Sequence, residues 1–377
     1  LKKLSEAYWT YNKNQKYKNF HGLRDFYSLT KYIGRGILVD KQIEQIDDVI
    51  VRGLLRNLGG LSKELRKSML SDFHKCLHTD HDIDIGVLEL IQNNLMDRQS
   101  RHLMLITNGD AVLSVLEDAV KEMERQHVVI FGSLFEEDLT DDYNYRILSR
   151  IILCMEQGFI LILKDLENIY GSLYDMLNQN YTVVGSKKNC RVALGPYSNP
   201  MCHVHEDFKC IVLVEESKLD YSDPPFLNRF EKQQFRFEDM MSTKAIKIRD
   251  SLVKFSSDIC TIEGCSYKPE HVFALSGENL ISSLVLKVQK EVIDDENIIQ
   301  NCQRHLLWIT APEAIIRIRD TMLWENQPNR VKKLQKEYFE LPIHKGLQTL
   351  LEFFKHCNIL FQKLDFYLRF IHRQIPD

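Results

Sequence analysis

Residues 102–110 read HLMLITNGD, and residues 111–124, which follow them, have the apolar spacing of a helix. The run 102–107 is short, mostly apolar and bounded by a turn, which is typical of a strand buried on both faces. The turn NGD joins this strand to the helix, and Asp110 is the expected N-cap. This region therefore predicts a strand–turn–helix unit of an α/β domain.

The same alternation of short apolar runs and helices continues toward the C-terminus. Further strands are predicted at 128–131, 159–163, 210–214 and 234–237, and helices at 145–156 and 169–179. Buried strands that are joined through helices run parallel, so the pattern predicts one open three-layer α/β domain, which we place at residues 99–245. Within it, Ile160, Leu161 and Ile162 are expected in the central strand, with helices over both faces.

Helices are predicted on both sides of this domain. Upstream, apolar residues within 26–37 repeat at intervals of three and four, and the helical stretch 43–58 ends at two glycines. Downstream, helical spacing returns at 280–292 and 331–339. No strand is expected before residue 100. The chain is thus expected to consist of helical residues 1–98, α/β residues 99–245 and a largely helical part, 246–377.

Composition narrows the classes of function. The chain has 377 residues, 44% hydrophobic and 27% charged, with a formal net charge of −4; this is typical of a globular protein and does not favour broad binding of nucleic acid. No apolar run approaches the ~20 residues of a transmembrane helix, so no transmembrane segment is expected. Residues 1–6 lack an initiator Met and the apolar core of a signal peptide. We therefore expect a cytoplasmic protein and a stretch from the middle of a longer chain.

One group among the nine cysteines resembles a metal site. It consists of Cys190, Cys202, His203, His205 and Cys210. Zinc sites usually combine two short pairs such as C-x2-C, and this group contains none. Cys210 also opens an apolar run. The pattern favours reduced thiols without metal, with zinc as the alternative.

The sequence lacks the loop with which nucleotide hydrolases hold phosphate. The pattern G-x4-G-K-[ST] occurs nowhere in the 377 residues. The turn at 108–110 is too short to wrap a triphosphate, and its Asp110 would repel one. After the strand 159–163, Asp165 and Glu167 alternate, whereas a magnesium-binding acidic pair would stand adjacent. Asp165 could hold a metal through water, but a capping or solvated carboxylate is favoured, so we expect neither cofactor nor metal in this domain.

Four strings of residues resemble a known family. They read FHGLRDFYSLTK (20–31), YGSLYDMLNQ (170–179), PPFLNRFEK (224–232) and LLWITAPEA (306–314). Their sequences and their order are similar to those of mysterin-type giant ring-finger AAA ATPases, which are also E3 ubiquitin ligases. The resemblance covers roughly residues 18–355, and residues 359–377 depart from the family's pattern.

The resemblance implies that the α/β fold is an AAA-type domain without a phosphate loop. Residues 1–98 would be the helical lid of a preceding AAA module with a connector, 99–245 a degenerate large domain, and 246–377 a lid-like segment with the start of the next module. The family implies ATP and magnesium in neighbouring modules of the same chain, and ubiquitin machinery that acts through elements outside this stretch. The implied function is that of a scaffold or regulatory segment of an ATP-hydrolysing ring-type E3 ubiquitin ligase, cytoplasmic and inactive on its own.

Two arginines gain a role through the same resemblance. Arg24, in a Gly-Leu-Arg string, is similar to the lid arginine that contacts the γ-phosphate of its own module. Arg229, in an Asn-Arg-Phe string, is similar to the finger arginine that reaches the ATP of a neighbouring module and stabilises the charge of the leaving phosphoryl group. The alternatives are a helix-capping ion pair of Arg24 with Asp25 or a neighbour, and an interface salt bridge of Arg229 with Glu231.

Two other classes of function compete with this one. A freestanding interaction protein could retain a dead ATPase-like fold for binding partners, and the length of the natural protein would separate it from a ring ATPase. A self-contained nucleotide hydrolase is disfavoured by the missing phosphate loop.

Overall fold

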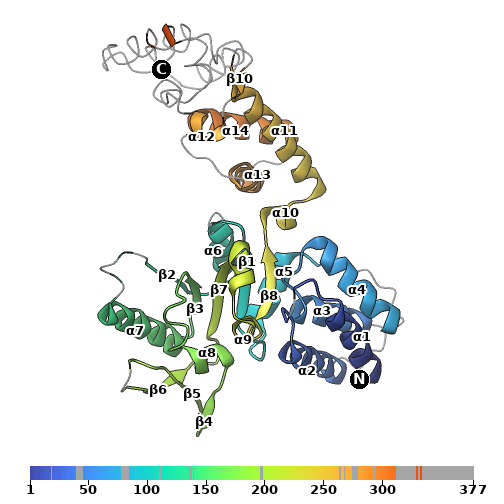
Figure 1. Ribbon diagram of the computed structural model, residues 1–377, viewed down its shortest axis with the longest axis vertical. Helices are drawn as coiled ribbons and strands as arrows, with labels where there is room; N and C mark the ends of the chain where they lie inside the picture. The colour runs from blue at the N-terminus through green and yellow to red at the C-terminus, as the bar shows by residue number, and fades with distance from the viewer. Residues whose placement is uncertain are drawn as a thin grey trace. The chain divides into compact units, whose positions relative to one another are not determined.

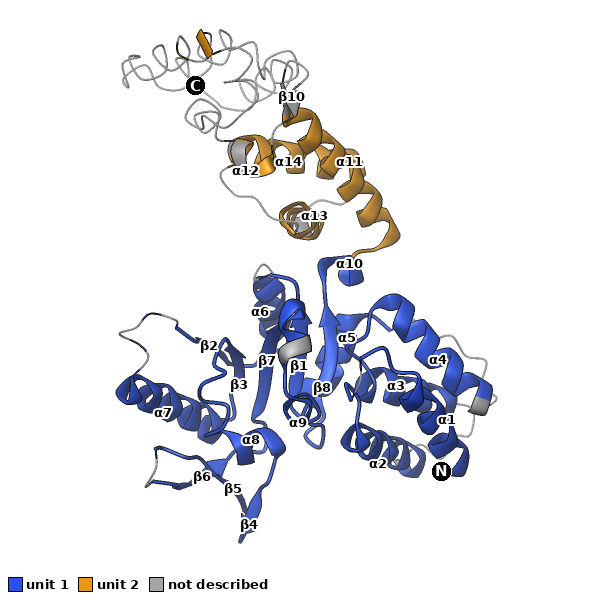
Figure 2. Cartoon of the chain, in the orientation of Figure 1, with its two compact units in different colours: residues 1–240 blue, residues 241–377 orange. Residues whose placement is uncertain are grey.

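The computed structural model divides the chain into two compact units, Leu1–Met240 and Met241–Asp377 (Figure 2). It describes residues 1–17, 19–39, 46–77, 85–109, 112–133, 135, 138, 140–195, 198–262, 265–266, 268–273, 279–291, 294–310, 328, 329 and 332. The first unit holds the sheet and the helices upstream of it, and the second is mainly helical.

A five-stranded parallel sheet forms the centre of the first unit (Figure 1). Its strands lie in the order β2-β3-β7-β1-β8, and every neighbouring pair is parallel. They are β1 (Leu103–Thr107), β2 (His127–Phe131), β3 (Ile160–Lys164), β7 (Lys209–Glu215) and β8 (Glu231–Phe235). The predicted α/β class is therefore confirmed.

Strands β1 and β3 are buried on both faces, whereas the edge strand β2 is partly exposed. All five residues of β1 and of β3 are buried, as a parallel sheet covered by helices requires. Leu148 and Ile151 of α7 (Asp141–Gln157) share a core with alternate residues of these strands. This part also contains α5 (Val87–Met96), α6 (Val112–Glu122) and α8 (Tyr174–Asn178).

Two details differ from the expectations. Strand β3 is buried as predicted, but β7 lies at the centre of the sheet, and β3 is its neighbour. The predicted helix 169–179 is reduced to α8, because turns occupy residues 167–173. Apolar spacing identifies which side chains are buried, but it does not distinguish a helix from a succession of turns.

Strand β8 is an edge strand with a polar sequence, EKQQF, and all five of its residues are buried. The predicted strand at 234–237 was therefore misplaced. The prediction rests on Phe235 and Phe237, but Phe237 begins the short helix α10 (Phe237–Met240). The burial of the polar residues depends on partners elsewhere in the chain, which a local pattern does not contain.

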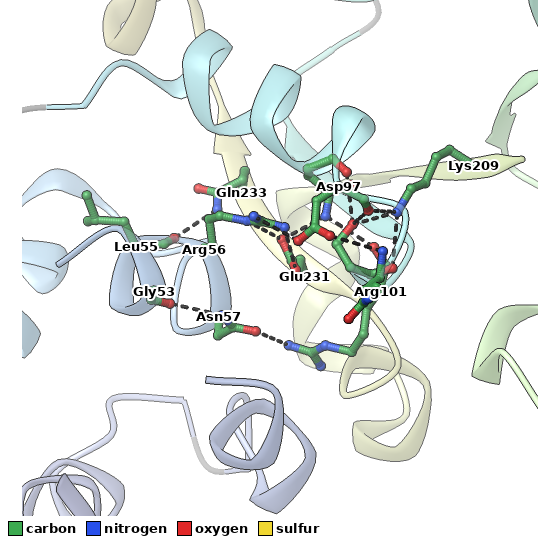
Figure 3. Close-up of polar contacts among 12 residues, drawn as sticks. Gly53, Leu55, Arg56, Asn57, Asp97, Arg101, Lys209, Glu231 and Gln233 are labelled. Carbon is green, nitrogen blue, oxygen red and sulfur yellow. Dashed lines mark hydrogen bonds and ion pairs between the residues drawn. The ribbon is translucent and has the colours of Figure 1, made fainter. Parts of the chain in front are cut away.

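Buried polar contacts join β8 to the helices that precede the sheet (Figure 3). Arg56 donates from Nε and Nη2 to the Glu231 carboxylate, both at 3.1 Å, and Asn94 Nδ2 donates to Glu231 Oε2 at 2.7 Å. Gln233 Nε2 donates to the carbonyl of Leu55 at 2.9 Å. These polar side chains thereby gain the partners that burial requires. The helices also cover a strand edge that would otherwise be open.

Four helices come before α5 in the first unit. They are α1 (Lys2–Lys13), α2 (Leu23–Val39), α3 (Ile46–Asn57) and α4 (Lys63–Leu77). Their apolar faces form one core, in which Leu29, Leu54, Leu58 and Phe73 have no exposed surface. After α3 the chain turns at Gly60, whose φ of 77° favours glycine. As expected, the described residues before 103 contain no strand.

A small antiparallel sheet, which the sequence patterns did not predict, lies between β3 and β7 in the sequence. It has the order β4-β5-β6 and consists of β4 (Thr182–Val184), β5 (Lys187–Arg191) and β6 (Met201–Val204). The β4–β5 turn contains Gly185 at a φ of 63°.

The second unit contains the helices α11 (Thr243–Ile259), α12 (Pro269–Val272), α13 (Leu280–Glu291) and α14 (Asp295–Trp308), and a pair of short strands, β9 (Thr261–Ile262) and β10 (Cys265–Ser266). Ser242 Oγ and Asp294 Oδ2 cap α11 and α14, each accepting from an amide at 3.2 Å. The predicted helical character from 280 is confirmed up to residue 308. The predicted helix at 331–339, apart from Lys332, and residues 359–377 lie outside the described residues.

The predicted division at residues 98 and 245 stays a prediction. No helix in the described part of the chain is both long enough and apolar enough to span a bilayer.

Candidate functional site

The carboxyl edge of the sheet is where an α/β domain of this kind normally binds its ligand. Strand β1 ends here at Thr107, and Asn108 and Gly109 follow, Gly109 with a φ of 79°. Asp110, the predicted N-cap, lies outside the described residues. Four residues, 108–111, separate the end of β1 from Val112, the first residue of α6, and a phosphate loop is longer.

Lysines neutralise the acids at this edge. Asp165 Oδ1 lies 2.7 Å from Lys218 Nζ, and Lys218 also lies 3.4 Å from Glu167. Lys164 Nζ lies 3.8 Å from both Asp165 and Glu215. Asp165 is thus a partly exposed, ion-paired carboxylate. A divalent cation at this position would have to displace two ammonium groups.

The cysteine and histidine group does not assemble into a metal site. Cys190 and Cys202 face each other across β5 and β6, and burial raises the pKa of Cys190 to about 12. Cys210 is fully buried in β7, where burial also raises its thiol pKa. His203 contacts the carbonyl of Lys188 at 3.1 Å. Among the described residues, no group of three or more His, Cys, Asp or Glu residues could hold a metal ion.

Arg24 lies in the first turn of α2, and its side chain is directed away from its sequence neighbour. Arg24 Nη1 donates to Asn178 Oδ1, at the end of α8, at 2.6 Å. Asp25, the alternative ion-pair partner, is fully buried and binds Lys232 and Arg101. The predicted alternative, an Arg24–Asp25 ion pair, does not occur.

Arg229 lies between the short helix α9 (Pro224–Leu227) and β8. Its guanidinium carbon is 4.5 Å from the ring centre of Tyr174 and 5.8 Å from that of Phe226, so it stacks on two aromatic faces. Glu231, the alternative partner of Arg229, binds Arg56. The second alternative ion pair is therefore absent as well.

The two arginines lie close enough to affect each other. Burial lowers the pKa of Arg229; Tyr174 and Asp223 oppose this shift, and the positive charge of Arg24 adds to it. Within the described residues, neither guanidinium has a carboxylate at ion-pair distance, although Arg229 feels the charge of Asp223. Structure thus brings together two residues that lie far apart in the sequence.

Two buried hydrogen-bond donors at the Arg24–Arg229 pair have no partner among the described residues. Arg229 Nε and Asn178 Nδ2 are buried and have no hydrogen-bond partner, and Asn228 Oδ1 nearby also lacks one. Buried donors normally have partners, so two free donors beside two guanidinium groups are a feature that requires an explanation. Two neighbouring guanidinium groups are suited to bind a phosphate or a carboxylate, because charge-assisted bonds from arginine to an oxyanion are strong.

Motif reasoning named the arginines but missed their surroundings. Tyr174 and Asn178, which contact the arginines, lie in the string YGSLYDMLNQ, and Asp25 and Lys232 lie in the strings that carry Arg24 and Arg229. Three strings with the family's sequence therefore meet at one place. Their common resemblance was the signal that could have identified these partners.

The five-stranded parallel sheet with flanking helices is the architecture of an AAA-type domain. Residues 92–241 match the family model described as the RNF213 AAA domain. They therefore form an AAA domain of the RNF213 type, and the resemblance to mysterin-type ring-finger AAA ATPases is confirmed.

The similarity extends over most of the chain. The chain is 27% identical over 399 residues to E3 ubiquitin-protein ligase RNF213 of Mus musculus and 26% identical over 387 residues to that of Homo sapiens, alignments that cover 98% and 94% of this chain. It is 29% identical over 272 residues, 70% of its length, to E3 ubiquitin-protein ligase rnf213-beta of Danio rerio. The chain spans 8%, 7% and 5% of the length of these relatives.

Proposed function

We propose that this chain works as a scaffold and regulatory segment of an ATP-hydrolysing ring-type E3 ubiquitin ligase. In this proposal its AAA domain binds no ATP itself. It presents Arg229 as a finger, together with the lid arginine Arg24, to the ATP and magnesium of a neighbouring module of the same chain. The similarity to RNF213 ligases supports the class of the parent protein.

One observation carries the proposal: Arg24 and Arg229 lie side by side with unfilled donors and no ion-paired carboxylate of their own. Two guanidinium groups at one place repel each other, so this arrangement costs stability unless an anion joins them. The γ-phosphate of a neighbouring nucleotide is such an anion. Its negative charge is redistributed in the transition state, where an arginine finger contributes roughly 10³–10⁵ in rate.

The carboxyl edge supports the second half of the proposal. Lys218 and Asp165 form an ion pair at the position where a nucleotide-binding module has its magnesium-binding acids. The ubiquitin machinery, the adjacent AAA modules and a cytoplasmic location are the partners and the setting that such a parent protein implies.

The test is ATP turnover in the full-length natural protein. We expect Arg229→Ala to lower kcat with little change in KM, because a finger acts mainly on the transition state. Arg24→Ala should lower kcat and raise KM, because a lid arginine also contacts ground-state ATP. Arg146→Ala, on the exposed side of α7, is the matched control and should change neither.

Two results would count against the proposal. If Arg229→Ala only lowers stability, with turnover per folded molecule unchanged, the arginine is structural. If neither variant affects turnover, this segment does not complete a neighbouring ATP site, and the alternative of a freestanding interaction protein with a dead ATPase-like fold takes its place.

A further inference from the structure

The buried carboxylate of Asp25 connects the two segments that carry Arg24 and Arg229. Asp25 has no exposed surface, and its Oδ2 accepts from the amide of Gly22 at 2.9 Å, which closes the first turn of α2. Its Oδ1 lies 3.1 Å from Lys232 Nζ and 2.9 Å from Arg101 Nη1. Asp25 thus holds the helix start that carries Arg24 and binds two cations, Lys232 in β8 and Arg101 just before β1.

The same two cations hold the segment that carries Arg229. Lys232 Nζ donates to the carbonyl of Leu227 at 3.2 Å, and Arg101 Nη1 donates to the carbonyl of Asn228 at 3.1 Å. These are the two residues that directly precede Arg229. The α9–β8 turn is therefore attached through its backbone to the cations that Asp25 binds.

The two segments also touch directly. A Cβ atom on Gly22 would lie 2.9 Å from Asn228 Nδ2, so only glycine leaves the Asn228 side chain where it is. Gly22 lies two positions before Arg24, and Asn228 lies one position before Arg229. The contact brings the two segments together close to both arginines.

The electrostatics of the cluster depend on Asp25. Burial acts to raise the pKa of Asp25, but Lys232 and Arg101 outweigh it and hold the pKa below its usual value. Burial lowers the pKa of Lys232 to about 8, and Asp25 limits this shift. Without the carboxylate, two buried cations would face each other, a situation that destabilises a protein strongly.

We infer that Asp25, through Lys232 and Arg101, is a positioning residue that sets the distance and orientation of Arg24 relative to Arg229. The catalytic consequence rests on the proposed function, whereas the coupling of the two segments does not. A displacement of about 1 Å in groups that act on one phosphate is enough to cost about a hundredfold in rate.

The coupling can be tested on the chain itself by amide hydrogen exchange. In Asp25→Asn, which keeps the shape and an acceptor for the Gly22 amide, we expect peptides 20–27 and 224–230 to exchange faster together, by about tenfold or more. Glu231→Gln is the matched control, because it removes an equally buried carboxylate from β8 that binds Arg56 and Asn94 instead. It measures the general cost of losing a buried carboxylate, and Asp25→Asn should accelerate both peptides well beyond it.

Acceleration of peptide 20–27 alone would overturn the inference, because Asp25 would then be only a helix cap. If Asp25→Asn does not fold, Arg101→Lys takes its place. A lysine keeps the charge but cannot contact Asp25, Asn228 and Asn57 together, as Arg101 does. The same joint acceleration of both peptides is expected.

Turnover in the full-length natural protein tests the positioning role. Per folded molecule, Asp25→Asn should lower kcat by about tenfold or more, with a smaller effect on KM, and Glu231→Gln should change neither. If Arg229→Ala slows turnover but Asp25→Asn slows it no more than Glu231→Gln does, the positioning role is wrong. If Arg229→Ala itself has no effect, the proposed function fails, and the exchange result alone decides the coupling.

Discussion

Arg56 and Glu231 lie 175 residues apart in the sequence and form a buried ion pair with two hydrogen bonds, Nε–Oε2 and Nη2–Oε1, both of 3.1 Å. Each side chain is 4% exposed. Arg56 lies in the last turn of α3, and Glu231 begins β8. The pair therefore joins the upstream helices to the edge of the AAA-type sheet. Glu231 follows Arg229 by two residues.

Loss of one partner of this pair should be costly. We expect Arg56→Met to lower the free energy of unfolding by ~3–5 kcal/mol, because it leaves Glu231 buried and charged without its cation. Arg56→Met combined with Glu231→Gln should cost less than the sum of the two single changes. Urea unfolding of the three variants measures this coupling.

The control for this prediction is Arg52→Met on the same helix. Arg52 forms a salt bridge with Glu89, and both side chains are more than 40% exposed. Such a surface pair contributes at most about 1 kcal/mol. Equal losses for Arg52→Met and Arg56→Met would show that the buried pair has no special weight.

A second prediction concerns β3. Leu161 has no exposed surface, and its strand is buried along its whole length. Leu161→Ala should lower the free energy of unfolding by ~2–5 kcal/mol through lost burial and the cavity left behind. Leu153 on α7, 53% exposed, is the control, and Leu153→Ala should cost less than about 0.5 kcal/mol. A cost for Leu161→Ala as small as that of the control would contradict the buried strand.

A third prediction concerns the pH dependence of stability. His21 is fully buried; its Nδ1 lies 2.7 Å from Tyr11 Oη and its Nε2 lies 2.8 Å from the carbonyl of Gly59. Burial, assisted by the charge of Lys232, lowers the pKa of His21 to about 3. Between pH 6.5 and 3 the unfolded chain therefore binds a proton that the folded chain does not.

It follows that stability falls as the pH drops below about 6.5. The contribution of His21 is a loss of up to about 1.4 kcal/mol per pH unit. His21→Gln does not titrate and keeps an amide donor for Gly59. It should be less stable than wild type at pH 7 but should lose stability more slowly toward pH 4. Urea unfolding at pH 7, 6, 5 and 4 measures both slopes, and parallel slopes would mean that His21 is not held neutral.

A fourth prediction concerns nucleotide. We expect millimolar Mg-ATP to leave the melting temperature of this chain unchanged, because the turn after β1 replaces a phosphate loop and Lys218 pairs with Asp165. Ligand at 100 times its dissociation constant would add about 2.7 kcal/mol of stability. An AAA domain with an intact phosphate loop serves as the positive control. A clear rise for this chain would show that its domain binds ATP.

The strands with continuous apolar sequence could be predicted from the sequence alone. The runs around Leu105, Ile130, Leu161 and Val212 are strands, because a parallel sheet covered on both faces requires continuous apolar sequence. The apolar runs do not determine the order of the strands in the sheet. Hydrogen bonding between strands decides it, and this pairing places β7 between β3 and β1.

Polar residues set the limit of prediction from the sequence. Glu231, Lys232 and Gln233 give no signal of burial by themselves, since lone charged residues are normally exposed. Their burial becomes possible only when Arg56, Asp25 and the carbonyl of Leu55 arrive from the helices upstream.

For the arginine site, the sequence by itself determined that Arg24 and Arg229 stand in strings with the family's pattern. Only the tertiary structure decided that the two arginines meet beside Asn178 and Tyr174. It also decided that Asp25 forms an ion pair with Lys232 rather than with Arg24. The physical reason is that a buried carboxylate must find cations that are buried with it, and which cations those are depends on how distant segments pack.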